Sequence, residues 1–116
     1  MELGLSNKVI VVSGGAKGIG FGITKVLAQE GATVCIIGRS AADNKVAVDA
    51  VLAAGGKAFG VEAELTDPND CKKAIDIVLE TFGTIDGLVN NAGVNDGVGL
   101  ENGSYEGFIA SLHKNL

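Results

Sequence analysis

The sequence predicts an α/β fold in which parallel strands alternate with helices within one domain. Short apolar runs alternate with longer segments whose apolar residues recur at helical spacing. A glycine-rich stretch, residues 13–20 (SGGAKGIG), lies between the first apolar run and the first helical pattern. The connections are short, as expected for strand–helix–strand units with right-handed crossovers.

The first four elements follow from apolar runs and glycines. Residues 9–13 (VIVVS) predict a strand, and residues 19–30 predict a helix that Gly31 ends. The apolar face of this helix is expected to hold Ile19, Ile23, Val26 and Leu27. A second strand is predicted over 33–37, because residues 34–37 are apolar without alternation, which is typical of a parallel strand covered on both faces. A second helix is predicted over 42–54.

The remaining elements continue the alternation. A third strand is predicted over 58–63, and Asp67-Pro68 marks the start of a third helix, with Asp as N-cap and Pro at the first helical position. Apolar residues recur along this helix at helical spacing: Cys71, Ala74, Ile75, Val78, Leu79 and Phe82. A fourth strand is predicted over 85–90, and a last helix begins near Tyr105.

Composition narrows the classes of partner. The 116 residues fit one domain, and the net charge of −5 without a basic stripe argues against nucleic acid or an anionic membrane. No apolar run is long enough to span a membrane, no signal peptide is visible, and the chain is expected to be cytoplasmic. Cys35 and Cys71 are expected to be reduced core thiols, and no metal site is predicted.

The glycine-rich turn predicts a site for a pyrophosphate. Glycines let the backbone bend sharply and let phosphates approach it closely. The first amides of the following helix have no intrahelical partner and attract an anion. The spacing is G-x-x-x-G-x-G, unlike the commoner G-x-G-x-x-G, and an ordinary tight turn is the alternative.

Three motifs together resemble the short-chain dehydrogenase/reductase family, and the resemblance covers the whole chain. Ser13-Gly14-x-x-x-Gly18-Ile19-Gly20 resembles the cofactor turn, and Asn90-Asn91-Ala92-Gly93 resembles the signature at the end of the central strand. Asn115 stands where the family has the Asn of its catalytic tetrad. The resemblance implies a Rossmann-type doubly wound parallel sheet with strand order 3-2-1-4, ending before a fifth strand. It also implies an NAD(P) site that includes Ser13, Gly14, Lys17, Gly18, Ile19, Gly20, Arg39, Ser40, Glu64, Leu65, Asn91, Ala92 and Gly93.

The end of the second strand predicts a preference for NADP(H), with NAD as the alternative. An acidic residue there would bind the adenosine ribose and repel a 2′-phosphate, but Gly38 occupies the position. Arg39 can pair with a phosphate through two N–H groups, and Lys17 could reach the same group. The alternative interpretation is that Arg39 is an ordinary solvated arginine at the end of a strand. Glu64 stands where the family often has an Asp that binds adenine, and a solvated charge is again the alternative.

The family's catalytic Ser and Tyr-x-x-x-Lys pair would follow the last residue of this chain. Tyr105 has Ile109, not Lys, four residues on, and reads as a helix-face residue. The chain is therefore expected to be the N-terminal part of an oxidoreductase, inactive alone, with Asn115 as its one tetrad member. An apolar edge at Leu88 and Val89 would then lie open, which predicts aggregation, dimerisation or pairing with the missing half.

The expected substrate is a small alcohol or carbonyl compound. Residues 95–116 resemble those of sugar-oxidising members such as L-fucose dehydrogenase. The alternatives are a 3-oxoacyl-carrier-protein reductase and a non-catalytic nucleotide-binding module or incomplete fragment. The resemblance also implies that the parent enzyme is a homotetramer.

Overall fold

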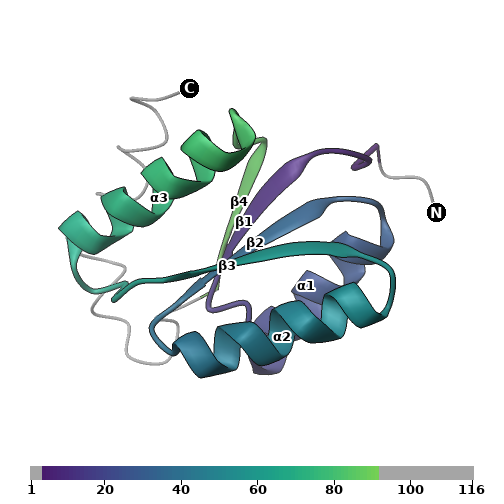
Figure 1. The fold of residues 1–116 in the computed structure, drawn as a ribbon, viewed down its shortest axis with the longest axis horizontal. Helices are drawn as coiled ribbons and strands as arrows, with labels where there is room; N and C mark the ends of the chain where they lie inside the picture. Colours follow the sequence, from purple (N-terminus) through teal and green to yellow (C-terminus); the bar gives the residue numbers. More distant parts are fainter. Residues whose placement is uncertain (1–3, 92–116) are drawn as a thin grey trace.

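The computed structural model describes residues 4–91, in which strands and helices alternate from end to end (Figure 1). The elements are β1 (Val9–Ser13), α1 (Gly18–Gln29), β2 (Thr33–Gly38), α2 (Ala41–Ala53), β3 (Lys57–Glu62), α3 (Pro68–Phe82) and β4 (Gly87–Asn90). Most predicted boundaries differ by a residue or two.

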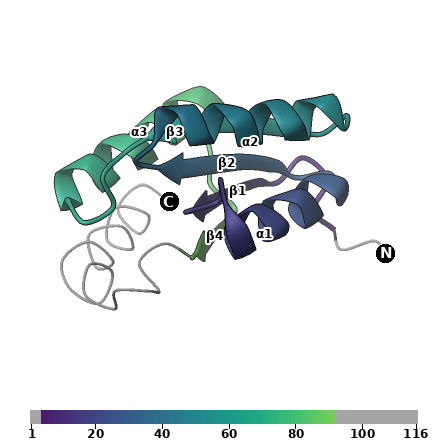
Figure 2. The same cartoon turned by 90° about the horizontal axis from the view of Figure 1, so that it is seen from below.

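The strands form one parallel sheet in the predicted order, β3-β2-β1-β4. Helices α1 and α2 cover one face of this sheet, and α3 covers the other (Figures 1 and 2). The order reverses between β1 and β4, because the chain leaves β1 toward β2 and returns to the other side of β1 for β4. The carboxyl ends of β1 and β4 therefore lie side by side, with Ser13 in register with Asn90.

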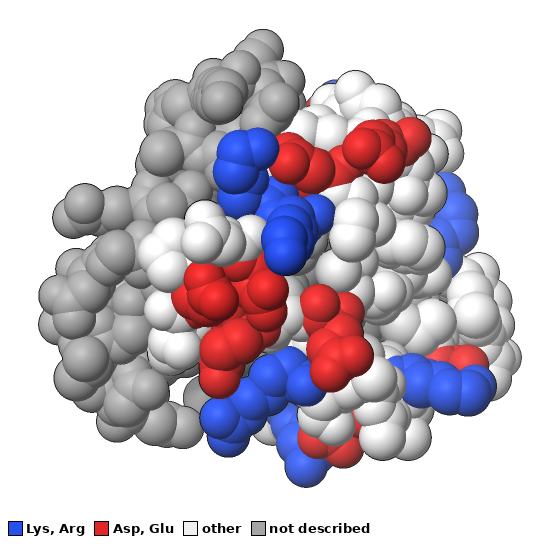
Figure 3. All heavy atoms as spheres, turned by 60° about the vertical axis from the view of Figure 1, so that its left-hand side comes forward, with Lys and Arg blue, Asp and Glu red and all other residues white. Residues whose placement is uncertain are grey.

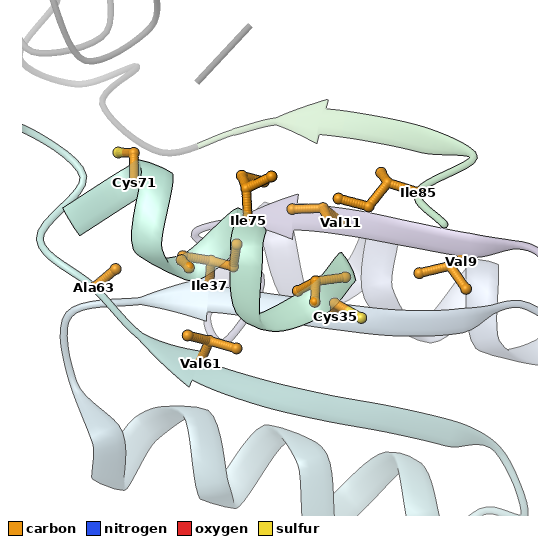
Figure 4. Close-up of a cluster of buried hydrophobic side chains, with 11 residues drawn as sticks. Val9, Val11, Cys35, Ile37, Val61, Ala63, Cys71, Ile75 and Ile85 are labelled. Atoms are coloured by element: carbon orange, nitrogen blue, oxygen red, sulfur yellow. The ribbon is translucent and has the colours of Figure 1, made fainter. Parts of the chain in front are cut away.

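The core has two halves, one on each face of the sheet. Successive β1 residues alternate between them, since side chains of a strand point to opposite faces. Val9 and Val11 pack on the α3 side (Figure 4), whereas Ile10 and Val12 pack on the side of α1 and α2. All of β2 between its first and last residues is buried, as the unalternating apolar run predicts.

Cys35 and Cys71 are both buried, and neither forms a disulfide, as predicted. Burial raises the pKa of the Cys35 thiol from its ordinary 9.0 to about 12. The Cys35 thiol is therefore protonated at neutral pH, and a nucleophilic role is unsupported because the thiolate is the reactive form.

Helix α1 corrects one expectation about packing. Its most exposed large apolar side chain is Ile19, 78% accessible, and Val26 is 53% accessible, although both were expected on the buried face. The buried residues of α1 are Gly20 and Thr24 instead. Small residues lie on the inner side of α1 because the helix packs against the glycine turn, where Gly20 contacts the Gly14 carbonyl.

Strand β4 begins two residues later than predicted. The Asp86 carboxylate accepts a hydrogen bond from the Val9 amide at 2.8 Å, and the Asp86 amide donates to the Val9 carbonyl at 2.7 Å. These bonds join the chain to β1 just before the ladder begins at Gly87. Leu88 and Val89 are half-buried against the two core halves, although β4 is an edge of the sheet within residues 4–91.

The expectations for the loop over 93–103, the helix from Tyr105 and Asn115 lie outside the described residues. Within residues 4–91, no helix is both long and apolar enough to cross a membrane.

Candidate cofactor-binding site

The glycine turn between β1 and α1 needs glycine at two positions for backbone conformation. Gly14 and Gly18 have φ values of 67° and 56°, in the left-handed region that side chains disfavour. A Cβ at Gly18 would meet no atom within 4 Å, so conformation rather than space requires glycine there.

Two other glycines are required by close packing. A Cβ on Gly20 would overlap the Gly14 carbonyl oxygen and lie 2.7 Å from Asn91 Nδ2. A Cβ on Gly15 would lie 2.8 Å from Thr24 Oγ1. Thr24 is fully buried, and its hydroxyl donates to the Gly15 carbonyl at 3.1 Å. The apolar pattern gave no signal for Thr24, which fixes the turn from inside α1.

Within residues 4–91, the N-terminus of α1 lacks the side-chain cap that α2 and α3 have. Ser40 caps α2 by accepting from the Asp43 amide at 3.1 Å, and Asp67 caps α3 by accepting from the Asn69 amide at 2.9 Å. Within the described residues, no side chain caps α1, and its first turn holds no acidic residue. The first amides of α1 are therefore left for an external acceptor, and the helix dipole favours an anion.

Hydrogen bonds join the ends of β1 and β4 beside this turn. The fully buried Ser13 hydroxyl donates to Asn90 Oδ1 at 3.0 Å and accepts from the Asn91 amide at 3.0 Å. Asn91 Nδ2 donates to the Gly14 carbonyl at 3.2 Å. Ser13 and Asn91 thus connect the glycine turn to the sheet, and these hydrogen bonds shape the site.

The end of β2 lies next to the same turn. Lys17 Nζ is 3.1 Å from Asp43 Oδ2, and the Asp43 amide in turn donates to Ser40. Lys17 therefore lies beside the first turn of α2, which begins two residues after Arg39. Arg39 is exposed and forms no ion pair with any residue between 4 and 91. The two cations predicted to bind a 2′-phosphate border one stretch of surface, although Asp43 already neutralises Lys17 in part.

The end of β3 holds the predicted adenine-binding residues. The Glu64 amide donates to Asp70 Oδ2 at 2.9 Å, so Asp70 in the first turn of α3 fixes this connection. Glu64 and Leu65 are half-buried, and Leu65 packs against the core on the α3 side. Asp70 was not singled out by the sequence, although an acid in the first turn of a helix is a known signal for a local cap.

The charges on this side of the molecule are mixed. Figure 3 shows basic and acidic side chains close together on the face that it presents, with no large area of one sign. A groove of about 490 Å³ between α1 and α2, lined by Phe21, Lys25, Ala28, Gln29, Ala50, Val51, Ala54, Gly55 and Gly56, lies elsewhere, toward the C-terminal ends of those helices. That groove is therefore separate from the glycine turn.

The structure thus brings most predicted site residues to one edge of the sheet. The glycine turn and Asn91 lie at β1 and β4, Arg39 and Ser40 follow β2, and Glu64 and Leu65 follow β3. Ala92, Gly93 and Asn115 lie outside the described residues. Ligands of open α/β sheets bind at such carboxyl ends, where the strand order reverses.

Comparison with known proteins agrees with this arrangement. The model of the short-chain dehydrogenase family matches residues 8–116. An uncharacterized oxidoreductase of Methylorubrum extorquens is 40% identical over 98 residues, which are 84% of this chain and 40% of that protein. Cyclohexanol dehydrogenase of an Acinetobacter species is 34% identical over 112 residues, 96% of this chain and 45% of that enzyme.

A solved structure gives the same result for the fold. The short-chain dehydrogenase/reductase of Serratia marcescens matches with a TM-score of 0.86 and 31% identity, over 97% of this chain and 52% of that one. The chain therefore spans about half the length of these relatives or less, and it corresponds to their cofactor-binding portion. The chain belongs to the short-chain dehydrogenase family.

Proposed function

We propose that this chain binds NADP(H) in preference to NAD(H), as the cofactor-binding part of an oxidoreductase that acts on an alcohol or carbonyl compound. The observation that carries the proposal is the uncapped N-terminus of α1 at the end of a turn shaped by four glycines. The two other helices in residues 4–91 have side-chain caps, so only α1 keeps its first amides for a ligand. A diphosphate is the ligand that such a turn accepts best.

Each part of the site has a distinct role in this proposal. The amides after Lys17 hold the diphosphate, and the Ser13–Asn91 bonds keep the turn against β4. Glu64 and Leu65 border the adenine. Ala92 and Gly93 would border a ribose, and Asn115 would contribute to proton transfer. When bound, the nicotinamide accepts or donates hydride, and this chain's residues orient the cofactor for that reaction.

The preference for NADP(H) rests on position 38 and on Arg39. Gly38 offers no carboxylate to a ribose diol, and Arg39 has no ion pair within residues 4–91 that a phosphate would have to break. A charge-assisted hydrogen bond is worth roughly 1.5–3 kcal/mol. Arg39→Asp should therefore weaken NADPH binding about ten- to hundredfold while changing NADH binding much less.

Calorimetric titration of the chain with NADPH and NADH tests both parts of the proposal. Lys73→Asp is a matched control, since it makes the same charge change on the exposed side of α3. It should leave both affinities unchanged. Equal NADPH affinity in wild type and Arg39→Asp would refute the preference, and absence of binding by the wild-type chain would refute the function itself.

The substrate proposal is narrower and rests on residues 95–116, whose sequence resembles sugar-oxidising members such as L-fucose dehydrogenase. Among the relatives named above, the cyclohexanol dehydrogenase has a name that gives a substrate, and that substrate is an alcohol. NADP-dependent oxidation of L-fucose by a full-length enzyme that contains this chain, compared with oxidation of cyclohexanol and with reduction of a 3-oxoacyl thioester, decides between these substrates. Turnover of the thioester without turnover of the sugar would reverse the proposal.

A further inference from the structure

Asn44, in the first turns of α2, is a buried polar residue that none of the motifs includes. Its side chain is 4% accessible, and its Nδ2 group donates to the Gly38 carbonyl at 3.0 Å and to the Val61 carbonyl at 3.2 Å. Since both partners are carbonyls, only the NH₂ group can face them, which fixes the orientation of the amide. Asn44 thereby ties the carboxyl ends of β2 and β3 to α2.

The oxygen of the same amide, Asn44 Oδ1, lies close to Gly38. A Cβ on Gly38 would be 2.9 Å from Asn44 Oδ1, closer than real Cβ contacts. The amide could move away only by giving up its two hydrogen bonds and leaving buried carbonyls with fewer donors. An acidic side chain at position 38 would also place its negative charge near the partial negative charge of Oδ1. Asn44 therefore opposes the residue that would favour NAD(H).

We infer that Asn44 is a positioning residue that determines cofactor specificity: it excludes a side chain at position 38 and holds the β2 end from which Arg39 extends. The inference rests on the proposed function, because it concerns the same adenosine end of the site. It predicts that positions 38 and 44 are coupled. Changing Gly38 alone should not convert the chain to NAD(H), whereas changing both residues should.

Affinities for NADPH and NADH, measured on the full chain carrying Gly38→Asp, Asn44→Ala or both, test the coupling. Gly38→Asp alone should lose NADPH binding without gaining NADH binding. The double variant should bind NADH at least about tenfold more tightly than Gly38→Asp does. Asn44→Ala alone should lower NADPH affinity several-fold by loosening the β2 end. A gain in NADH affinity by Gly38→Asp equal to that of the double variant would overturn the inference.

Thermal melting provides a test that needs no nucleotide. Gly38→Ala should lower the melting temperature by about 5 °C beside Asn44 and by much less in the Asn44→Ala background. Gly22→Ala is the control, because a Cβ there meets nothing within 4 Å, and it should behave alike in both backgrounds. Equal effects of Gly38→Ala in the two backgrounds would overturn the coupling. A wild-type chain that binds neither nucleotide would instead overturn the proposed function, and with it the role in specificity.

Discussion

The glycine turn after β1 and the end of β2 are neighbouring parts of one site that are built in different ways. The turn is shaped mainly by backbone: left-handed glycines, a helix end without a cap, and Gly20 packed on the Gly14 carbonyl. The β2 end is shaped by side chains at the start of α2, namely the Ser40 cap and the buried Asn44 amide. A backbone-built region admits few substitutions, whereas a side-chain-built region can change its specificity through a few residues.

The difference also concerns charge. The first turn of α1 contains no acidic residue, which suits a diphosphate shared by NAD and NADP. The first turn of α2 contains Asp43, which pairs with Lys17. Under the proposed function, the turn apart from Lys17 would supply the interactions common to both cofactors, and the β2 end would supply those that separate them.

The largest expected effect breaks the turn. Gly20→Ala forces a Cβ onto the Gly14 carbonyl, a backbone atom that cannot move without displacing the turn. Unfolding should become easier by about 3 kcal/mol, at the upper end of overpacking effects, and binding of both nucleotides should be lost. Denaturant unfolding and calorimetry measure the two effects.

Gly22→Ala, in the same helix, is the matched control. It lies in open space, so it should stabilise the chain by about 0.5–1 kcal/mol through the higher helix propensity of Ala. Similar effects of the two substitutions would contradict the packing argument.

Two serines compare the regions directly. Ser13→Ala leaves the part-buried backbone amide of Asn91 without this acceptor and should cost about 1–3 kcal/mol. Ser40→Ala removes a helix cap and should cost about 1 kcal/mol. Ser13→Ala should weaken NADPH and NADH binding alike, whereas Ser40→Ala should weaken NADPH binding more. The reverse pattern in paired titrations would argue against the division between the regions.

A pH titration tests the core of the sheet, which supports both regions and contains the buried Cys35. The folded Cys35 pKa, about 12, exceeds its ordinary 9.0, so the unfolded thiol loses its proton first as pH rises. Stability should be unaffected by Cys35 below pH 9.0 and should fall by about 1.4 kcal/mol per pH unit between the two values. Denaturant unfolding of Cys35→Ala at pH 8 and 10 should lack this part of the loss. An identical alkaline loss in that variant would contradict the assignment.

The smallest expected effect, that of Asp43→Asn, tests whether charges at the β2 end influence NADPH affinity. Asp43→Asn frees the exposed Lys17 from its pair and removes a negative charge near the proposed phosphate site. NADPH affinity should rise about two- to fivefold at low salt, with NADH affinity unchanged, and the gain should shrink as salt screens the charges. Asp49→Asn breaks the Lys45 pair farther along α2 and should change neither affinity.

Sequence patterns predicted the part of this protein that depends on local chemistry. The order of strands and helices, the Asp67-Pro68 start of α3 and the buried strand β2 follow from propensity and periodicity. The glycine turn was found because glycine itself carries the signal. The motifs also predicted the parallel order β3-β2-β1-β4.

Periodicity failed where packing distances decided. It placed Ile19 and Val26 on the buried side of α1, although Gly20 and Thr24 occupy that side. An apolar pattern reports which residues prefer burial, but only the approach of the helix to the Gly14 carbonyl requires a small residue. Thr24 and Asn44 gave no signal, since a polar residue in a helix is normally exposed.

The sequence alone therefore determined the fold class and the place of the glycine turn, because both depend on residues close together along the chain. The tertiary structure alone decided which carbonyls Thr24 and Asn44 would satisfy, because the partners come from separate elements: Val61, for example, lies 17 residues from Asn44. Buried polar side chains are stable only when such partners are brought to hydrogen-bonding distance, and folding is the step that does so.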